Sequence, residues 1–341
     1  MPKTYNNLWK QICSWENLHS AFIEARKGKK FKNEALRFGS RLEENLTNIH
    51  NHLIWKSWRP GPWREFWHTD PKVRFIQAPP FQDRIVHHAL VDVIQPYFVR
   101  KFIHDSNACI AGRGTHAAMG RVNEMLRRTS RSWSRTYVLK ADISRYFPSI
   151  SHDILMRILS RTIRDKDVLW LCDTIIRQNE SPRGIPVGFL TSQLFANVYL
   201  DQLDHCMKDA WGVKNYVRYM DDFVVLGSSK KELWDMLEMI QDFLAMKLAL
   251  SLNPKTAIYP ARKGVDFAGY RIWPTHILPR KRNLKRARKT FKSLSRAYAE
   301  GKIGLEYIKP RLASFLGYTK HCSSWRSTES VLNDLVLQRQ N

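Results

Sequence analysis

The chain has 341 residues, 43% of them hydrophobic and 12% aromatic, enough to bury the cores of two or three subdomains, which excludes a disordered chain. Lysine and arginine number 56 against 31 acidic residues, and a net charge of +25 favours a partner with a phosphate backbone. No apolar run reaches the roughly 18 residues of a membrane helix, and the N-terminus lacks the order of a signal peptide, so we expect a cytoplasmic protein.

Near the N-terminus, four tryptophans fall within 13 residues: Trp55, Trp58, Trp63 and Trp67. Core packing of this region is the main expectation, and stacking on RNA bases is the alternative. Five cysteines are scattered along the whole chain without a C-x-x-C pair: Cys13, Cys109, Cys172, Cys206 and Cys322. We expect free thiols there, rather than zinc ligands or disulfides.

Three segments have the periodicity of amphipathic helices with a polar residue placed to cap each one. They are Thr115 before Met119, Val122 and Leu126; Thr191 or Ser192 before Leu194, Phe195, Val198 and Tyr199; and a capping box of Ser229 and Glu232 before Leu233, Leu237, Ile240 and Leu244. We expect all three apolar stripes to lie in the core.

Between these helices lie short β-rich runs, an alternation typical of α+β or α/β folds. Residues 136–143 predict a strand that ends near Asp142, and residues 215–220 and 223–227 predict two strands of a hairpin. Asp221 and Asp222 stand at the junction of that hairpin, where Asp tolerates turn conformations. Adjacent carboxylates repel each other, so the pair needs open water or a cation.

Asp142 lies about 80 residues before the pair, and a strand end and a hairpin tip can converge. Three converging carboxylates could hold two Mg²⁺ ions for in-line phosphoryl transfer, as in polymerases. For an Asp-Asp dipeptide alone, a solvated turn is the stronger interpretation.

The C-terminal part of the chain contains a strongly basic segment with a single acid, Glu300. Its bases are Arg280, Lys281, Arg282, Lys285, Arg286, Arg288, Lys289, Lys292, Arg296 and Lys302. This composition predicts a separate basic helical module.

The surroundings of the acids decide between the two interpretations. "YMDD", preceded by "ADISRYF" and "GIPVGFLTSQLFANVYL", resembles the palm of reverse transcriptases in the order motif A, motif B, motif C. "VRFIQAPPFQDRIVHHAL" and "GRGTHAA" resemble the fingers segment and the motif after it, "GVDFAGYRIWP" resembles the primer grip, and "SWENLHSAF" extends the match towards the start.

Motif B narrows the resemblance. Val187 and Gly188, followed by Ser192 and Gln193, give the pattern V/I-G-x-x-x-S-Q, which is similar to diversity-generating retroelement reverse transcriptases. That resemblance implies an enzyme that copies a template-repeat RNA into adenine-mutated cDNA with a basic pentameric accessory protein. The alternatives are a retron, group II intron or antiviral reverse transcriptase, and a non-catalytic RNA-binding protein of the same fold.

The resemblance also implies a role for individual residues. Asp142, Asp221 and Asp222 would bind two Mg²⁺ ions, with Mn²⁺ as a substitute, and be catalytic. The nucleotide site would comprise Lys72, Arg74, Phe147, Val187, Gly188, Gln193 and Lys255. Phe147 would be a steric gate or a core aromatic, Lys72 and Arg74 would hold the triphosphate or form a plain basic strand face, and Lys255 would be a general acid or a surface lysine.

Gly269 and Tyr270 would shape the primer grip. Template and primer would contact Arg84, Arg113, Arg280, Lys281, Arg282, Lys285, Arg286 and Lys289. Arg84 could instead pair with a local acid. The expected architecture is an α+β right-hand polymerase, with an N-terminal helical region in residues 1–60, fingers and palm in 61–275 and a basic helical thumb in 276–341. An RNase H or endonuclease activity is expected to come from elsewhere.

Overall fold

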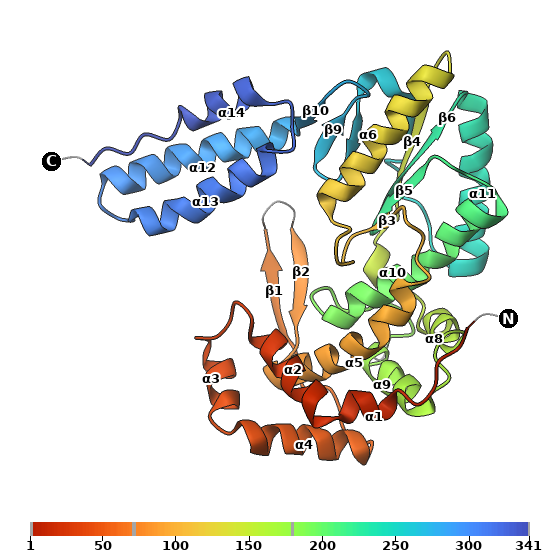
Figure 1. Cartoon of the computed structure of the whole chain (residues 1–341), viewed down its shortest axis with the longest axis vertical. Helices are drawn as coiled ribbons and strands as arrows, with labels where there is room; N and C mark the ends of the chain where they lie inside the picture. The colour runs from red at the N-terminus through yellow and green to blue at the C-terminus, as the bar shows by residue number, and fades with distance from the viewer. Residues whose placement is uncertain (1–2, 70–72, 179–180, 340–341) are drawn as a thin grey trace. The chain divides into compact units, whose positions relative to one another are not determined.

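The computed structural model describes residues 3–69, 73–178 and 181–339, and it divides into two compact units (Figure 1). Unit 1 comprises Met1–His104, Ile143–Gly212 and Met239–Pro254. Unit 2 comprises Asp105–Asp142, Val213–Glu238 and Lys255–Asn341. Each unit is thus assembled from three separate stretches of sequence.

Unit 1 is mainly helical. Its elements are α1 (Trp9–Cys13), α2 (Trp15–Arg26), α3 (Asn33–Gly39), α4 (Leu42–Ile54), β1 (Arg64–His68), β2 (Arg74–Ala78), α5 (Phe81–Val99), α7 (Tyr146–Ser149), α8 (His152–Ser160), α9 (Lys166–Ile176), α10 (Leu190–His205) and the π-helix η1 (Cys206–Ala210). Asp165 caps α9 by accepting from the Asp167 and Val168 amides, and its other oxygen accepts from Leu8 N at 2.8 Å. One carboxylate thus fixes the start of α9 to the chain just before α1.

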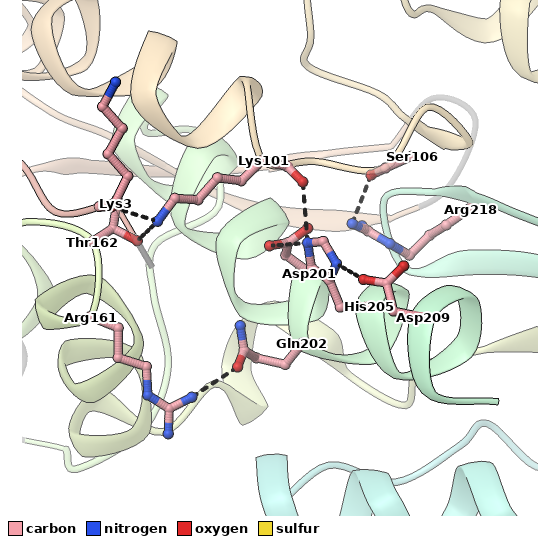
Figure 2. A network of polar contacts seen from close by, with 10 residues as sticks. All are labelled: Lys3, Lys101, Ser106, Arg161, Thr162, Asp201, Gln202, His205, Asp209 and Arg218. Carbon is pink, nitrogen blue, oxygen red and sulfur yellow. Dashed lines mark hydrogen bonds and ion pairs between the residues drawn. The ribbon is translucent and has the colours of Figure 1, made fainter. Parts of the chain in front are cut away.

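A polar network connects the segment just after α5 with the end of α10 inside unit 1 (Figure 2). His205 directs Nε2 at the Lys101 carbonyl, 3.1 Å away, and Nδ1 at Asp209 Oδ2, 2.6 Å away. The Lys101 ammonium donates to Thr162 Oγ1 at 3.0 Å. Because Asp209 lies in the π-helix, the widened turn contributes one of the carboxylates that face His205.

Unit 2 contains a five-stranded sheet in the order β3-β5-β6-β4-β7. The strands are β3 (Ser106–Asn107), β4 (Tyr137–Asp142), β5 (Tyr216–Tyr219), β6 (Asp222–Gly227) and β7 (Ala257–Pro260). Helix α6 (Thr115–Ser132) packs on one face, where Met119, Val122 and Leu126 meet Val138 and Val224. The period-2 alternation of the strands places these valines on one face of the sheet.

A second layer of unit 2 consists of the 3₁₀ helix η2 (Ala261–Lys263) and the antiparallel strands β8 (Val265–Phe267), β9 (Tyr270–Ile272) and β10 (Ile277–Pro279). Three helices follow: α12 (Lys281–Ala299), α13 (Leu305–Thr319) and α14 (Trp325–Leu332). They share a small core of Phe291, Leu294, Ile308, Phe315 and Val331. Helix α11 (Lys230–Leu248) begins in unit 2 and ends in unit 1.

The predicted strands and helical stripes are confirmed, whereas two of the three predicted caps are wrong. Ser229 Oγ accepts from the Glu232 amide at 3.1 Å at the start of α11. Helix α10, however, begins before Thr191, whose hydroxyl pairs with buried His87 at 2.8 Å, and Thr115 is the first helical residue of α6 rather than its cap. Both threonines therefore lie one position or more inside their helices.

The four tryptophans do not share one environment. Trp58 is buried, as core packing requires, but Trp55 is 70% exposed and Trp67 is 65% exposed. The expectation of core packing is therefore wrong for Trp55 and Trp67, because aromatic content alone does not determine burial. None of the five cysteines, all of which lie in the described residues, forms a disulfide. In the described part of the chain, no helix has both the length and the apolar character needed to span a membrane.

Candidate active site

Two of the three predicted acids face each other across the sheet of unit 2. Asp142 is the last residue of β4, Asp222 is the first residue of β6, and the antiparallel register pairs them directly. Directly opposite residues have Cβ atoms roughly 4.5–5.5 Å apart and point to the same face. Asp221 precedes Asp222 in the two-residue turn between β5 and β6. The hairpin thus places Asp221 and Asp222 next to the end of β4, with Asp142 directly opposite Asp222.

A buried arginine, Arg218, stabilises the backbone of this turn. Met220 has φ +57°, a left-handed conformation that is uncommon for a residue with a long side chain. Arg218 is fully buried and donates from Nη1 to the Met220 carbonyl at 2.8 Å. Its Nη2 donates to Ser106 Oγ at 2.8 Å (Figure 2). The Met220 amide donates to the Asn107 carbonyl at 3.2 Å. These bonds fix the backbone that carries Asp221.

Asp222 is the electrostatically perturbed member of the group. Burial, reinforced by the charges of Asp142 and Asp221, raises the pKa of its carboxyl to about 6, although Lys140 acts in the opposite direction. The Lys140 ammonium donates to Asp222 Oδ2 at 3.2 Å. The other oxygen, Oδ1, is buried without a hydrogen-bond partner among the described residues. A buried carboxylate oxygen with no donor is suited to a cation.

Within residues 3–69, 73–178 and 181–339, no three His, Cys, Asp or Glu side chains are gathered closely enough to hold a metal by themselves. The three predicted acids therefore do not meet the spacing of a metal site by themselves, although Asp142 and Asp222 stand directly opposite each other.

In unit 1, the predicted motif B residues lie against strand β2. The Gln77 amide donates to the Val187 carbonyl at 2.9 Å. Gly188 has φ +121°, and a Cβ there would lie 2.6 Å from the Gln77 carbonyl oxygen. Only glycine satisfies both the conformation and this close approach. The position of Gly188 is thus set by packing between the motif B loop and β2.

Gly188 and two other predicted residues, Arg84 and Gln193, line a cavity of about 850 Å³ in unit 1. Lys29, Lys32, Arg64 and Glu34 also line it. Arg84 donates from Nε to the Pro79 carbonyl at 3.1 Å, and burial lowers the pKa of its guanidinium. Arg84 forms no ion pair with any described residue, so the alternative in which it pairs with a local acid is wrong.

The other residues predicted for the nucleotide site lie in different elements and differ in burial. Arg74 is the first residue of β2 and is exposed, whereas Lys72 lies outside the described residues. Phe147 lies in α7 and is half-buried, with its ring 5.7 Å from that of Tyr146. Lys255 is exposed in the stretch after α11. Their roles at a nucleotide site stay predictions.

The predicted primer-grip pair belongs to a tightly bonded part of unit 2. Gly269 has φ +95°, and its carbonyl accepts from the Tyr318 hydroxyl at 2.7 Å. The same hydroxyl accepts from the Arg280 amide and from Asn283 Nδ2, both at 3.0 Å. Tyr270 is buried and its ring lies 4.9 Å from that of Tyr318. Tyr318 therefore ties the β8–β9 turn to the start of α12.

The predicted nucleic-acid cations fall into two groups. Arg280 is half-buried and forms an ion pair with Asp266, and Arg113 is half-buried in the loop before α6. The others lie exposed on α12: Lys281, Arg282, Lys285, Arg286 and Lys289. By contrast, Arg288 and Lys292 on the same helix face Asp334. The side chains of this second group are exposed to solvent, and their contact with a phosphate backbone stays a prediction.

Three residues that position the site were not predicted: Lys140, Arg218 and Tyr318. Lys140 shares the face of Asp142 by the period of the strand, so the alternation in "VLKAD" could have indicated it. Arg218 is a charged residue within an apolar strand directly before the acids, which is also a usable signal. Tyr318 lies 49 residues from Gly269 and has no such signal.

The chain is similar in sequence to several known proteins. The sequence profile of the family described as "Reverse transcriptase (RNA-dependent DNA polymerase)" matches residues 68–272. The chain is 25% identical to Protein YkfC of Escherichia coli (strain K12) over 276 residues, covering 68% of this chain and 72% of YkfC. It is 22% identical over 304 residues to Group II intron-encoded protein LtrA of Lactococcus lactis subsp. cremoris, covering 67% of this chain and 50% of LtrA.

A shorter match, 31% identical over 111 residues, is to Nuclear intron maturase 1, mitochondrial, of Arabidopsis thaliana, covering 31% of this chain and 14% of the maturase. Among solved structures, apo telomerase from Candida tropicalis aligns with a TM-score of 0.51 at 12% identity, covering 82% of this chain and 63% of that chain. The chain thus spans half of LtrA and less than two-thirds of the telomerase. The expected fold, an α+β right-hand polymerase, is confirmed.

Proposed function

Because the chain belongs to the reverse transcriptase family, we propose that it is an RNA-directed DNA polymerase, with Asp142, Asp221 and Asp222 as its catalytic carboxylates. The observation that carries this proposal is the register of the sheet, which sets Asp142 opposite Asp222, the residue that follows Asp221. Three acids at the end of a short sheet are the arrangement that two-metal nucleotidyl transfer requires.

The residues of this site fit divalent cations. Carboxylate oxygens are the ligands that Mg²⁺ prefers, and the buried, partnerless Oδ1 of Asp222 supplies one such oxygen. When bound, two Mg²⁺ ions would activate the primer hydroxyl and neutralise the triphosphate, and Mn²⁺ could substitute. Lys140 holds the second oxygen of Asp222 and so partly neutralises the acids in the absence of a cation.

A separate set of predicted residues would bind the incoming nucleotide. We assign the triphosphate to Arg74 and Lys72, the exclusion of a 2′-hydroxyl to Phe147, and the shape of the site to Val187, Gly188 and Gln193. Arg fits a phosphate as a bidentate fork and Lys as a point charge. Lys255 would lie near the pyrophosphate. The hydrogen bond from Gln77 to Val187 and the close packing of Gly188 against Gln77 support the idea that motif B and the fingers strand act as one piece.

The primer terminus would rest on Gly269 and Tyr270, and the copied duplex on the exposed cations of α12. Arg84 and Arg113 would add contacts to template phosphates. The partners implied are the RNA template, the RNA/cDNA duplex and dNTPs. The lack of acid partners for Lys281, Arg282, Lys285 and Lys289 within the described residues supports this assignment.

At a finer level we propose a diversity-generating retroelement enzyme, which copies a template-repeat RNA into adenine-mutated cDNA together with a basic pentameric accessory protein. Support comes from Val187 at the start of motif B and from its Ser192-Gln193 ending. A second candidate, an enzyme of the group II intron type, is favoured by the similarity to LtrA and to the intron maturase.

Two experiments test these levels separately. Extension of a DNA primer on an RNA template with dNTPs and Mg²⁺ tests the polymerase, and Asp221→Asn should abolish it while RNA binding is retained. Sequencing of the cDNA tests the finer proposal: errors should concentrate at template adenines, and Val187→Gln should reduce those errors more than others. Active enzyme with an even error spectrum would favour the second candidate.

A further inference from the structure

A second basic surface of unit 2 lies where helix α6 ends. Residues 127–135 read "RRTSRSWSR", with four arginines and no acid, and Arg262 and Lys263 lie in the 3₁₀ helix η2. Here the chain forms a cavity of about 450 Å³, lined among others by Trp133, Tyr137, Arg135 and Arg262. A cavity of this volume is within the range of small-molecule sites. We call this region the α6-end site.

The α6-end site is separate from the three acids. Tyr137 is the first residue of β4 and Asp142 is the last, so one whole strand lies between the two. At about 3.3 Å per residue, this separates them by roughly 17 Å. A ligand in the cavity therefore leaves the catalytic carboxylates accessible.

The cations of this site are not neutralised by the protein. Arg127 Nε donates to the Pro274 carbonyl at 2.9 Å, and Arg128 Nη2 donates to Asn215 Oδ1 at 2.7 Å. Neither these two nor Arg131, Arg135, Arg262 and Lys263 form an ion pair with any described residue. Arg121, earlier on the same helix, is instead paired with Asp105 and Glu124. Along α6, the arginine near the start is therefore ion-paired, whereas the arginines near the end are not.

We propose that the α6-end site binds a single-stranded polynucleotide, with one base in the cavity against Trp133 and Tyr137 and the phosphates on the surrounding arginines. Base stacking on an aromatic ring combined with a basic surface is the arrangement of single-strand binding proteins. Five of the six cations are arginines, which grip phosphate as a bidentate fork. An acidic protein would satisfy the charges but would not require an aromatic cavity beside them.

This proposal goes beyond polymerisation, because the strand held here is not the strand being copied. It would anchor a distal part of the enzyme's own RNA, or the displaced cDNA, while the active site works. The two sources share one chemistry, and oligonucleotides of RNA and of DNA distinguish them.

The test uses the full chain saturated with an RNA–DNA template–primer whose 3′ end is a dideoxynucleotide, so that the catalytic site is filled. Binding of a fluorescent, non-complementary 12-nucleotide RNA is then measured by anisotropy at several salt concentrations. We expect the saturated enzyme to bind the probe. The variant Arg131→Gln/Arg135→Gln/Arg262→Gln should lose at least about tenfold in affinity, and its salt slope should fall by about 0.7 for each lost phosphate contact.

Trp133→Leu should weaken binding by at least about fivefold with an unchanged salt slope, because stacking is not a charge effect. Trp133 also packs against the core, so Trp133→Phe, which retains an aromatic face, should restore most of the affinity. A 4-thiouridine probe should crosslink to the peptide that contains Trp133. The control Lys230→Gln/Lys231→Gln, on the exposed start of α11, should bind like the parent.

Primer extension on a short template should be equal in all these variants, which keeps this test separate from that of the polymerase itself. A saturated enzyme that does not bind the RNA or DNA probe, or a triple variant that binds like the parent, would overturn the proposal. So would displacement of the probe by poly-glutamate together with no effect of Trp133→Leu, which would assign the surface to an acidic protein.

Discussion

The substitution Asp222→Asn should stabilise the metal-free protein at neutral pH. Burial raises the pKa of this carboxyl from an ordinary 3.8 to about 6. Since each tenfold change in acidity corresponds to about 1.4 kcal/mol, the ionised side chain costs the folded state about 3 kcal/mol above pH 6. The asparagine carries no charge and avoids this penalty, while its amide still fills the space of the carboxyl.

The pH dependence has a definite sign. Below pH 3.8 the carboxyl is protonated in the folded and the unfolded chain, and it contributes no difference. Between pH 3.8 and 6 the folded state binds the additional proton, so the parent loses stability as the pH rises through this range. The stability advantage of Asp222→Asn should therefore be near zero at pH 4 and about 2–3 kcal/mol at pH 7.5.

The measurement is urea unfolding in EDTA, followed by circular dichroism, with hydrogen exchange of β4 and β6 peptides to identify the transition of this sheet. Asp235→Asn, at an exposed position on α11, is the control and should follow the parent at both pH values. Added Mg²⁺ should stabilise the parent more than Asp222→Asn. A variant that is no more stable than the parent at pH 7.5 would refute the argument that Asp222 is a buried, insufficiently compensated charge.

Three further substitutions test other parts of the structure. Gly188→Ala should destabilise unit 1 by more than about 2 kcal/mol, measured by thermal unfolding, because its Cβ meets the Gln77 carbonyl; Gly269→Ala, which has a similar φ but open space around it, should cost less. Tyr318→Phe should raise the KM for template–primer about fivefold without changing the KM for dNTP, because it removes a hydrogen bond of roughly 1 kcal/mol between α13 and the β8–β9 turn. Equal changes in both constants would contradict this. The variant Arg282→Gln/Lys285→Gln/Lys289→Gln neutralises three exposed cations of α12 and should lower the salt slope of duplex binding by about 0.7–0.9 per lost contact. An unchanged slope would place the duplex elsewhere.

The acids and their strands were predictable because both signals are local. The alternation of apolar residues marks β4, β5 and β6, and adjacent acids between two apolar runs mark a hairpin. Register then follows from the turn, so the meeting of Asp142 with Asp222 needed only the additional step that β4 pairs with β6.

Features that depend on distant contacts were not predictable in the same way. Thr191 has the residue type of a cap, but its hydroxyl pairs with His87, 104 residues away, and the helix begins before it. Trp55 and Trp67 are exposed because of the positions they take in the folded chain, and composition does not predict these positions. The bond from Tyr318 to Gly269 likewise joins segments that carry no shared pattern.

The order of strands in the sheet of unit 2 also has a consequence for how the protein is made. Strand β4 lies between β6 and β7, which begin 80 and 115 residues after β4 ends and leave the ribosome correspondingly later. During synthesis at about 5–20 residues per second, the apolar β4 thus waits for several seconds with both edges unpaired. Unpaired apolar strands are sites of aggregation, so the nascent chain needs protection until β6 and β7 have emerged. A ribosome-bound fragment that ends before residue 221 would hold Asp142 without the other two acids, so the proposed metal site can form only after β6 has emerged.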